Sequence, residues 1–189
     1  MSKIISVWSR KGGAGKSTLA INLAAIATQN GYKVLLLDSD KQGSCLWIAT
    51  FGKLPFDVKN TLPAEHDYSL IIQDCAPNLD NVPLGQVVVV PFCASSLDIG
   101  SVRKFIPMLK EKGKRVLEVI SKVNWQRKEP KSFALQKQKG GAYVIKDRAV
   151  YLNAGNDSTT IFDKAMNKAY KVNEARVEVS TIFNKALEG

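Results

Sequence analysis

The chain of 189 residues has the length of one large domain, and it is long enough to bury a substantial hydrophobic core. Hydrophobic residues make up 45% and charged residues 23% of the chain, which excludes a largely disordered or fibrous protein. A net charge of +10 favours a polyanionic partner, either nucleic acid or an anionic membrane. We therefore expect a single domain over residues 1–189 with a polyanionic partner.

The excess positive charge lies in the second half of the chain. Residues 1–100 carry 8 basic and 8 acidic side chains, whereas residues 101–189 carry 19 basic and 9 acidic ones. The difference in the second half, 19 minus 9, accounts for the whole net charge of +10. An asymmetry of this kind indicates a basic patch or tail rather than a uniformly basic surface.

The cysteines and the apolar runs favour a cytoplasmic protein. Cys45, Cys75 and Cys93 lie 30 and 18 residues apart, and His66 is the only histidine, so the sequence disfavours a zinc site. An odd number of cysteines and the lack of a signal peptide fit a reducing compartment, where such cysteines act as small buried hydrophobes. No apolar run approaches the roughly 20 residues that a membrane helix needs.

The first forty residues predict a strand, a phosphate-binding type of loop, a helix and a second strand. Residues 3–8 are apolar and β-branched, glycines gather at 12–15, and residues 17–30 have helical spacing. Gly31 is placed to end this helix, and the apolar segment 34–37 leads into Asp38 and Asp40. A βαβ unit is therefore complete by residue 38.

Apolar runs and helical segments continue to alternate along the rest of the chain. The predicted elements are strands at 70–72, 87–90, 116–120 and 143–145, helices at 99–112 and shortly after Pro130, a turn at 153–158, and one or two final helices. Strands that alternate with helices indicate a mostly parallel, twisted sheet covered by helices on both faces. We therefore expect an α/β fold of the P-loop NTPase type.

The glycine cluster departs from the usual phosphate-loop pattern GxxxxGK[ST] at its first position, where Arg10 replaces glycine. The segment from Lys11 to Thr18, KGGAGKST, nevertheless lies between a predicted strand and a predicted helix. Small residues let backbone N–H groups surround phosphate oxygens, Lys16 can neutralise the β and γ phosphates, and the Ser17 hydroxyl can bind Mg²⁺. The sequence therefore predicts a nucleoside triphosphate site.

The extra Lys11 makes this segment similar to KGGxGK[ST], the deviant Walker A motif of the ParA/MinD family of positioning ATPases. Residues 36–42 (LLDSDKQ) resemble the DxDPQ segment of that family, residues 68–77 resemble its Walker B strand, and 87–91 resemble the next strand. Lys41 and the triplet 75–77 depart from the family pattern. The resemblance implies an ATPase with ATP and Mg²⁺ as cofactors. It also implies that ATP is bound by the loop residues and by an adenine-contacting asparagine, namely by Lys11, Gly12, Gly13, Ala14, Gly15, Lys16, Ser17, Thr18 and Asn124.

Acidic residues at two predicted strand ends supply candidate metal ligands. Asp38 and Asp74, together with Ser17, are expected to hold Mg²⁺ directly or through water. Asp40 follows two residues after Asp38, on the same side of an extended chain, and the resemblance makes it the candidate for orienting the attacking water. We interpret Asp80 and Asp98, also near strand ends, as solvated turn residues.

The resemblance gives Lys11 a role across a subunit interface, where it would reach the nucleotide of the partner in a homodimer. It would then act as an arginine finger does, by stabilising charge on the transferred phosphoryl group, and Lys11 and Asp40 are the predicted catalytic residues. Hydrolysis would be slow until a partner protein, such as a ParB-like centromere-binding protein or a cargo adaptor, completes the site.

The main functional hypothesis is a ParA-type ATPase for DNA partition or cargo positioning, associated with the nucleoid. Its ATP-bound dimer would bind DNA without sequence preference through the basic second half, with Arg127, Lys128, Lys146 and Arg148 as candidate contacts. The first strand begins by residue 3, so we expect no preceding helix-turn-helix domain and no sequence-specific repression.

Two other classes remain as alternatives. A MinD-like membrane-positioning ATPase needs a basic amphipathic tail, but Glu174, Glu178 and Glu188 interrupt the final helix and oppose anionic lipid, so membrane binding is disfavoured. An electron-transfer or kinase relative would need a cysteine pair or a tyrosine-rich tail, and neither is evident. Plasmid, chromosome and carboxysome cargo remain equally open.

Overall fold

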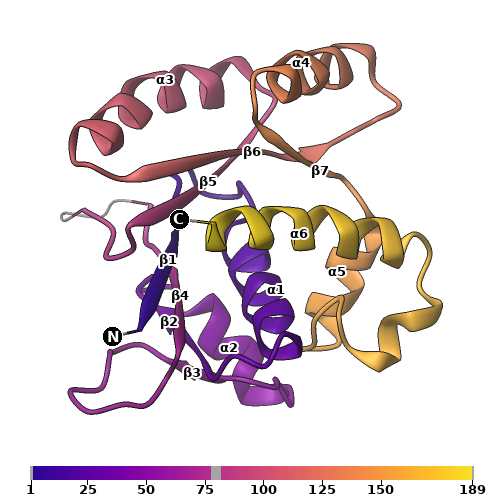
Figure 1. The fold of residues 1–189 in the computed structure, drawn as a ribbon. Helices are drawn as coiled ribbons and strands as arrows, with labels where there is room; N and C mark the ends of the chain where they lie inside the picture. Colours follow the sequence, from indigo (N-terminus) through magenta and orange to yellow (C-terminus); the bar gives the residue numbers. More distant parts are fainter. Residues whose placement is uncertain (1, 78–81, 189) are drawn as a thin grey trace.

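The computed structural model describes residues 2–77 and 82–188 (Figure 1). Its seven strands form one sheet in the order β3-β2-β4-β1-β5-β6-β7, and all pairs are parallel. The strands are β1 (Lys3–Val7), β2 (Val34–Asp38), β3 (Asp57–Lys59), β4 (Leu70–Asp74), β5 (Val87–Cys93), β6 (Arg115–Val123) and β7 (Tyr143–Lys146). The helices are α1 (Lys16–Gln29), α2 (Ser44–Phe51), α3 (Ser96–Glu111), α4 (Lys128–Lys139), α5 (Ala149–Asn156), the 3₁₀ helix η1 (Lys164–Lys168) and α6 (Val172–Leu187). The predicted α/β fold with a parallel sheet is confirmed.

The central strands read as continuous apolar runs because both of their faces are buried. In β5, Val87 and Val89 pack into the core that contains α1 and α6, whereas Val88 and Val90 pack into the core that contains α3. All four residues are at most 3% exposed. A strand in a parallel sheet needs apolar side chains on both sides, which is why alternation is absent here.

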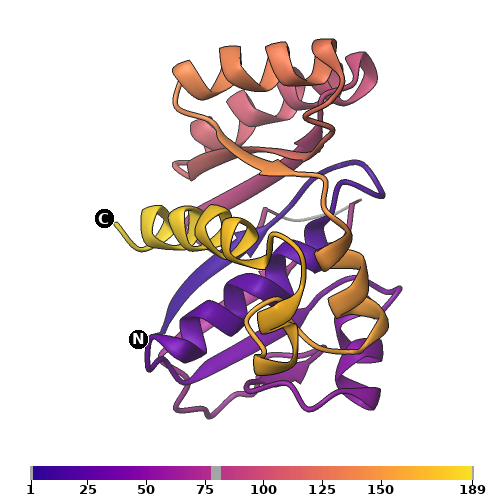
Figure 2. The same cartoon turned by 90° about the vertical axis from the view of Figure 1, so that its right-hand side faces the viewer.

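Helices cover the two faces of the sheet unequally. Helices α1 and α6 pack on one face, and α3 and α4 stand together on the other face over β5, β6 and β7 (Figure 2). On that second face, over β1, β2 and β4, the buried cluster of Leu35, Leu37, Tyr68 and Ile71, with the partly buried Ile4 packed against it, comes only from strands and from the loop before β4. Helical cover of the second face is therefore confined to one half of the sheet in the described structure.

Several short elements differ from the sequence prediction. The eight-residue helix α2 and the three-residue edge strand β3 were not predicted, because neither is long enough to show a clear period. Helix α4 begins before Pro130, which lies in its first turn, where no intrahelical N–H is required. Helix α5 extends to Asn156, so the predicted turn at 153–158 begins inside a helix.

The C-terminal helix α6 is part of the core. Its buried residues form one stripe of Val172, Ala175, Val179, Ile182, Phe183 and Ala186. This stripe packs against α1 and β7. In the described part of the chain, no helix is both long and apolar enough to cross a membrane.

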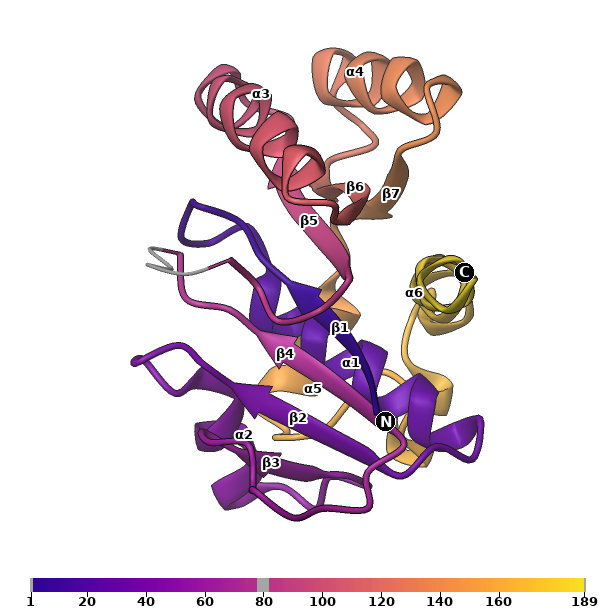
Figure 3. The same ribbon diagram turned by 60° about the vertical axis from the view of Figure 1, so that its left-hand side comes forward.

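The strand order places the loops of interest at one edge of the sheet. Strands β1 and β5 are neighbours, and the connection after β1 runs to β2 on one side whereas the connection after β5 runs to β6 on the other. Figure 3 shows the loops after β1 and β2 projecting from the same edge, at the carboxyl ends of the strands. Open parallel sheets bind ligands at such a switch point. The predicted phosphate loop and the predicted carboxylates are therefore brought to one place.

Candidate nucleotide-binding site

The loop between β1 and α1 has the backbone of an anion-binding loop. Gly13 and Gly15 have φ angles of 77° and 83°, in the left-handed region that glycine adopts without strain. A Cβ atom at Gly12 or Gly13 would have nothing within 4 Å, so the space beside the backbone is open. Helix α1 has neither a side-chain cap nor an acidic residue in its first turn. Its N-terminal N–H groups are therefore available to phosphate oxygens.

Lys16 and the residues after it are placed as the motif requires. The Lys16 side chain is buried against the loop, and its Nζ atom lies 3.4 Å from the carbonyl oxygen of Lys11. The Ser121 hydroxyl donates to the Ala14 carbonyl at 2.8 Å, which ties the loop to β6. Ser17 is half-buried and Thr18 is exposed at the start of α1. The loop thus holds the Lys16 ammonium on its inner side, and contact of Lys16 with the β and γ phosphates stays a prediction.

Asp38 and Asp74 end adjacent strands and face each other in register. They are 1% and 0% exposed, and the Oδ1 atom of Asp74 is buried without a hydrogen-bond partner in the described structure. Burial raises the pKa of Asp74 to about 6, the Ser17 hydroxyl and the Cys45 thiol oppose this rise, and the charge of Asp38 adds to it. A divalent cation would satisfy the unpartnered oxygen and stabilise the carboxylate charge. The residues present therefore fit the predicted Mg²⁺.

Cys45 is a third member of this cluster, and the sequence analysis treated it only as a small buried hydrophobe. Its Sγ atom donates to Asp74 Oδ2 at 3.2 Å, and one ligand atom each of Asp38, Cys45 and Asp74 lie within 4.8 Å of one another. The N–H groups of Cys45 and Leu46 both donate to Asp38 Oδ2, at 2.9 and 3.1 Å. Asp38 therefore also fixes the start of α2, a contact that no sequence motif indicated.

Asp40 lies in a turn and not in an extended chain. Its Oδ1 atom accepts the N–H of Gln42 at 3.1 Å, and its carbonyl accepts the N–H of Gly43 at 2.9 Å. Strand β2 ends at Asp38, so the argument that placed Asp40 and Asp38 on one side of an extended strand does not hold. The half-buried Asp40 carboxylate is at the same sheet edge, and its role in orienting water stays a prediction.

Two substitutions of Asp40 separate catalysis from turn formation. Asp40→Asn keeps an oxygen that can accept the Gln42 N–H, whereas Asp40→Ala removes it. If the carboxylate orients the attacking water, both variants should bind ATP and dimerise but hydrolyse ATP about a hundredfold more slowly. Phosphate release at saturating ATP measures this. Normal hydrolysis by Asp40→Asn, with a defect only in Asp40→Ala, would assign Asp40 to the turn.

The interpretation of Asp98 as a solvated turn residue is wrong, whereas Asp80, interpreted in the same way, lies outside the described residues. Asp98 is 5% exposed in the first turn of α3, and its carboxylate forms an ion pair with Lys11. The two lysines of the loop therefore have different surroundings. Lys16 contacts the loop itself, whereas Lys11 reaches out to another helix.

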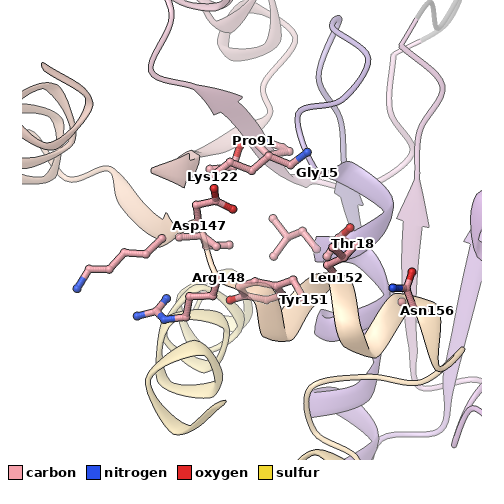
Figure 4. Close-up of a pocket in the computed structure, with 14 residues that line it drawn as sticks. Gly15, Thr18, Pro91, Lys122, Asp147, Arg148, Tyr151, Leu152 and Asn156 are labelled. Carbon is pink, nitrogen blue, oxygen red and sulfur yellow. The ribbon is translucent and has the colours of Figure 1, made fainter. Parts of the chain in front are cut away.

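A cavity of about 480 Å³ opens beside the first turn of α1 (Figure 4). Its lining includes Gly15 and Thr18 from the phosphate loop and Lys122, Asp147 and Tyr151 from the β6 and β7 ends and α5. Its place next to the loop suits the base and ribose of a nucleotide. Asn124 lines the neighbouring hollow instead, and its Oδ1 atom accepts the N–H of Gln126 at 3.0 Å. Contact between Asn124 and adenine stays a prediction.

The candidate DNA contacts differ in their availability. Arg127 and Lys128 are exposed at the start of α4, and the Lys146 ammonium lies 4.4 Å from the centre of the Trp125 ring. Arg148 is different, because its guanidinium forms a bidentate ion pair with Glu178 and its side chain is only 8% exposed. The role of Arg148 visible in the structure is thus to join the segment before α5 to α6.

Comparison with known proteins assigns the family. Residues 5–146 match the model of the CobQ/CobB/MinD/ParA nucleotide binding domain. The chain belongs to this MinD/ParA family. The match spans the last three residues of β1, the phosphate loop and every strand from β2 to β7.

The names of similar proteins refer to two kinds of cargo. A maintenance of carboxysome distribution protein A from Halothiobacillus neapolitanus is 26% identical over 93% of this chain and 95% of its own length. The protein of the same name from Gloeobacter kilaueensis is 37% identical, but the match spans only 51% of this chain and 52% of that protein. A plasmid partition protein from Borrelia burgdorferi, solved with AMPPNP, has a TM-score of 0.75 at 22% identity and covers 99% and 100% of the two chains. That structure supports the fold.

Proposed function

We propose that this protein is a ParA-type ATPase that positions DNA or another cargo. ATP and Mg²⁺ would join two copies of the chain, the dimer would bind DNA without sequence preference, and hydrolysis would release it. A ParB-like or cargo-adaptor protein would stimulate the hydrolysis. The nucleoid would then be the surface on which the cargo moves.

The observation that carries this proposal is that the two lysines of the loop have different positions and different contacts. Lys16 is buried against the phosphate loop, whereas Lys11 extends from it to α3 and is 45% exposed. A second cation that lies outside the phosphate pocket of its own subunit would serve another subunit's nucleotide once it leaves Asp98. Such a cation from a partner stabilises charge in the transition state and couples hydrolysis to assembly.

The identity of the cargo is a separate question from the ATPase cycle. Relatives of the family are named for carboxysome distribution and for plasmid partition, so both cargoes are candidates for this chain. We expect the same ATP-dependent cycle in either case, because the same phosphate loop would bind ATP whichever cargo is positioned.

Arg127 and Lys128 are the candidate DNA contacts that the structure leaves most available. Reversing both charges in Arg127→Glu/Lys128→Glu should weaken binding of the ATP-bound dimer to duplex DNA by about tenfold or more. It should also flatten the salt dependence of binding, because fewer phosphates are neutralised. ATP-driven dimerisation should persist. Fluorescence anisotropy with two unrelated duplexes across a salt series measures both effects.

A matched control applies the same charge change at the opposite end of the sheet. Lys53 and Lys59 are exposed at and before the edge strand β3, far in strand order from β6 and β7. The salt dependence of DNA binding by Lys53→Glu/Lys59→Glu should be closer to that of the unmodified chain than the salt dependence of Arg127→Glu/Lys128→Glu is. Equal loss in the two double variants would indicate a general charge effect. A strong preference for one duplex, or equal binding with ADP and ATP, would contradict the proposed cycle.

The position of α6 argues against the MinD-like alternative, in which the last helix would bind a membrane. The apolar stripe that would enter a membrane is buried against α1 and β7. Membrane binding would require this stripe to leave the core and expose the surface beneath it. We therefore keep DNA, and not lipid, as the proposed polyanion.

A further inference from the structure

Asp98 is held in place by the backbone around it and meets Lys11 from a buried position. Its Oδ2 atom accepts the N–H of Cys93 at 3.0 Å, and its own N–H donates to the Ser95 hydroxyl at 3.2 Å. Its side chain is 6% exposed, whereas that of Lys11 is 45% exposed. Oδ1 has no partner besides the Lys11 ammonium among the described residues. The aspartate is thus the buried member of the pair, held by the backbone, and the lysine is the more exposed member.

The carboxylate depends on Lys11 to balance its charge. Burial by itself would raise the pKa of Asp98, but the Lys11 ammonium and the Cys93 N–H outweigh burial and keep this pKa below its ordinary value. Asp98 is therefore ionised at neutral pH. If Lys11 moved to another anion, Asp98 would become a buried charge without a partner, which is strongly unfavourable.

We propose that Asp98 is a positioning residue that competes with the partner subunit's nucleotide for Lys11, and so sets the protein concentration at which ATP drives dimerisation. This inference rests on the proposed action of Lys11 across the dimer. The ion pair keeps Lys11 within its own subunit until a phosphate group offers a stronger interaction.

Nucleotide binding within the subunit would remove a second contact that holds the same residue. The Lys16 ammonium lies 3.4 Å from the carbonyl oxygen of Lys11. Phosphate in the loop would draw Lys16 toward itself and free this carbonyl. The ion pair with Asp98 would then be the contact that keeps the Lys11 side chain within its own subunit. The order of events is therefore nucleotide first and transfer of Lys11 second, so dimerisation depends on ATP.

A neutral residue at position 98 tests the competition. Asp98→Asn keeps an oxygen for the Cys93 N–H but removes the charge that attracts Lys11. ATP-dependent dimerisation should then occur at about tenfold lower protein concentration than in the unmodified chain. Light scattering over a protein dilution series with saturating ATP and Mg²⁺ gives the midpoint. Asp98→Ser, a second neutral variant, should shift the midpoint in the same direction.

Two further variants separate this role from a merely structural one. Asp98→Glu restores the carboxylate and should return the midpoint toward that of the unmodified chain. Glu111→Gln makes the same charge change at the exposed far end of α3 and should leave the midpoint unchanged. An unchanged or higher midpoint in both neutral variants overturns the inference. If the unmodified chain and Asp98→Asn both fail to dimerise with ATP, the proposed function fails as well, so the two failures are distinguishable.

Discussion

Lys16→Ala should abolish ATP binding, with at least a hundredfold loss of affinity. The Lys16 ammonium is the buried cation of the phosphate loop, and its removal leaves the β and γ phosphate charges without a fixed counter-charge. Isothermal titration calorimetry with a non-hydrolysable ATP analogue measures this directly. The nucleotide-free variant should keep its fold, because Lys16 makes no ion pair with an acidic side chain in the described residues.

The matched control for this variant is Lys41→Ala. Lys41 is an exposed lysine in the loop after β2, at the same edge of the sheet, so it tests the loss of one positive charge near the site. We expect its ATP affinity to stay within a few-fold of the unmodified chain. Normal ATP affinity in Lys16→Ala would contradict the assignment of the phosphate loop itself.

Lys11→Ala should bind ATP nearly normally yet lose both ATP-dependent dimerisation and hydrolysis. Lys11 pairs with Asp98 and not with the phosphate loop, and we propose that it acts on the nucleotide of a second subunit, so its loss should spare ATP binding within one subunit. By analogy with a cation supplied in trans, hydrolysis should fall by about a hundredfold or more. Light scattering with and without ATP and a phosphate-release assay measure the two effects.

Lys11→Ala also leaves the Asp98 carboxylate without its ion-pair partner, so a control for that loss is needed. Lys11→Ala/Asp98→Asn removes both charges of the pair and should remain unable to dimerise. Arg10→Ala removes the neighbouring exposed cation and should dimerise normally. If Lys11→Ala or the double variant dimerises with ATP as the unmodified chain does, Lys11 does not act across an interface.

The phosphate loop could be predicted because its residues are contiguous and each one has a distinct physical task. Gly13 and Gly15 adopt the left-handed backbone, and Lys16 lies inside the loop. The strand ends Asp38 and Asp74 could also be predicted, since apolar runs that end in aspartate mark the binding edge of a parallel sheet. Features of this kind can be predicted from the sequence because they depend on residues that are adjacent in the chain.

The remaining parts of the site arise from contacts between distant segments. Cys45 approaches Asp74 over 29 positions, and the base-side cavity combines α1 with residues 145–156. Asp98 looked like an ordinary turn residue because its partner, Lys11, is 87 positions earlier, 98 minus 11. No periodicity or spacing rule reports such pairs. The Asx turn at Asp40 was also missed, because the argument assumed that the strand continued.

The pair between Arg148 and Glu178 links the last helix of the chain to the ligand cavity. Glu178 accepts the Lys146 N–H at 3.2 Å as well as the Arg148 guanidinium, so one carboxylate on α6 anchors the segment between β7 and α5. That segment forms one wall of the cavity beside the phosphate loop. Glu178, whose negative charge opposes binding of α6 to anionic lipid, thus fixes the wall of the cavity by these three hydrogen bonds. If the cavity takes the base and ribose of ATP, substitutions in α6 should change the affinity for ATP, although no residue of α6 lines the cavity.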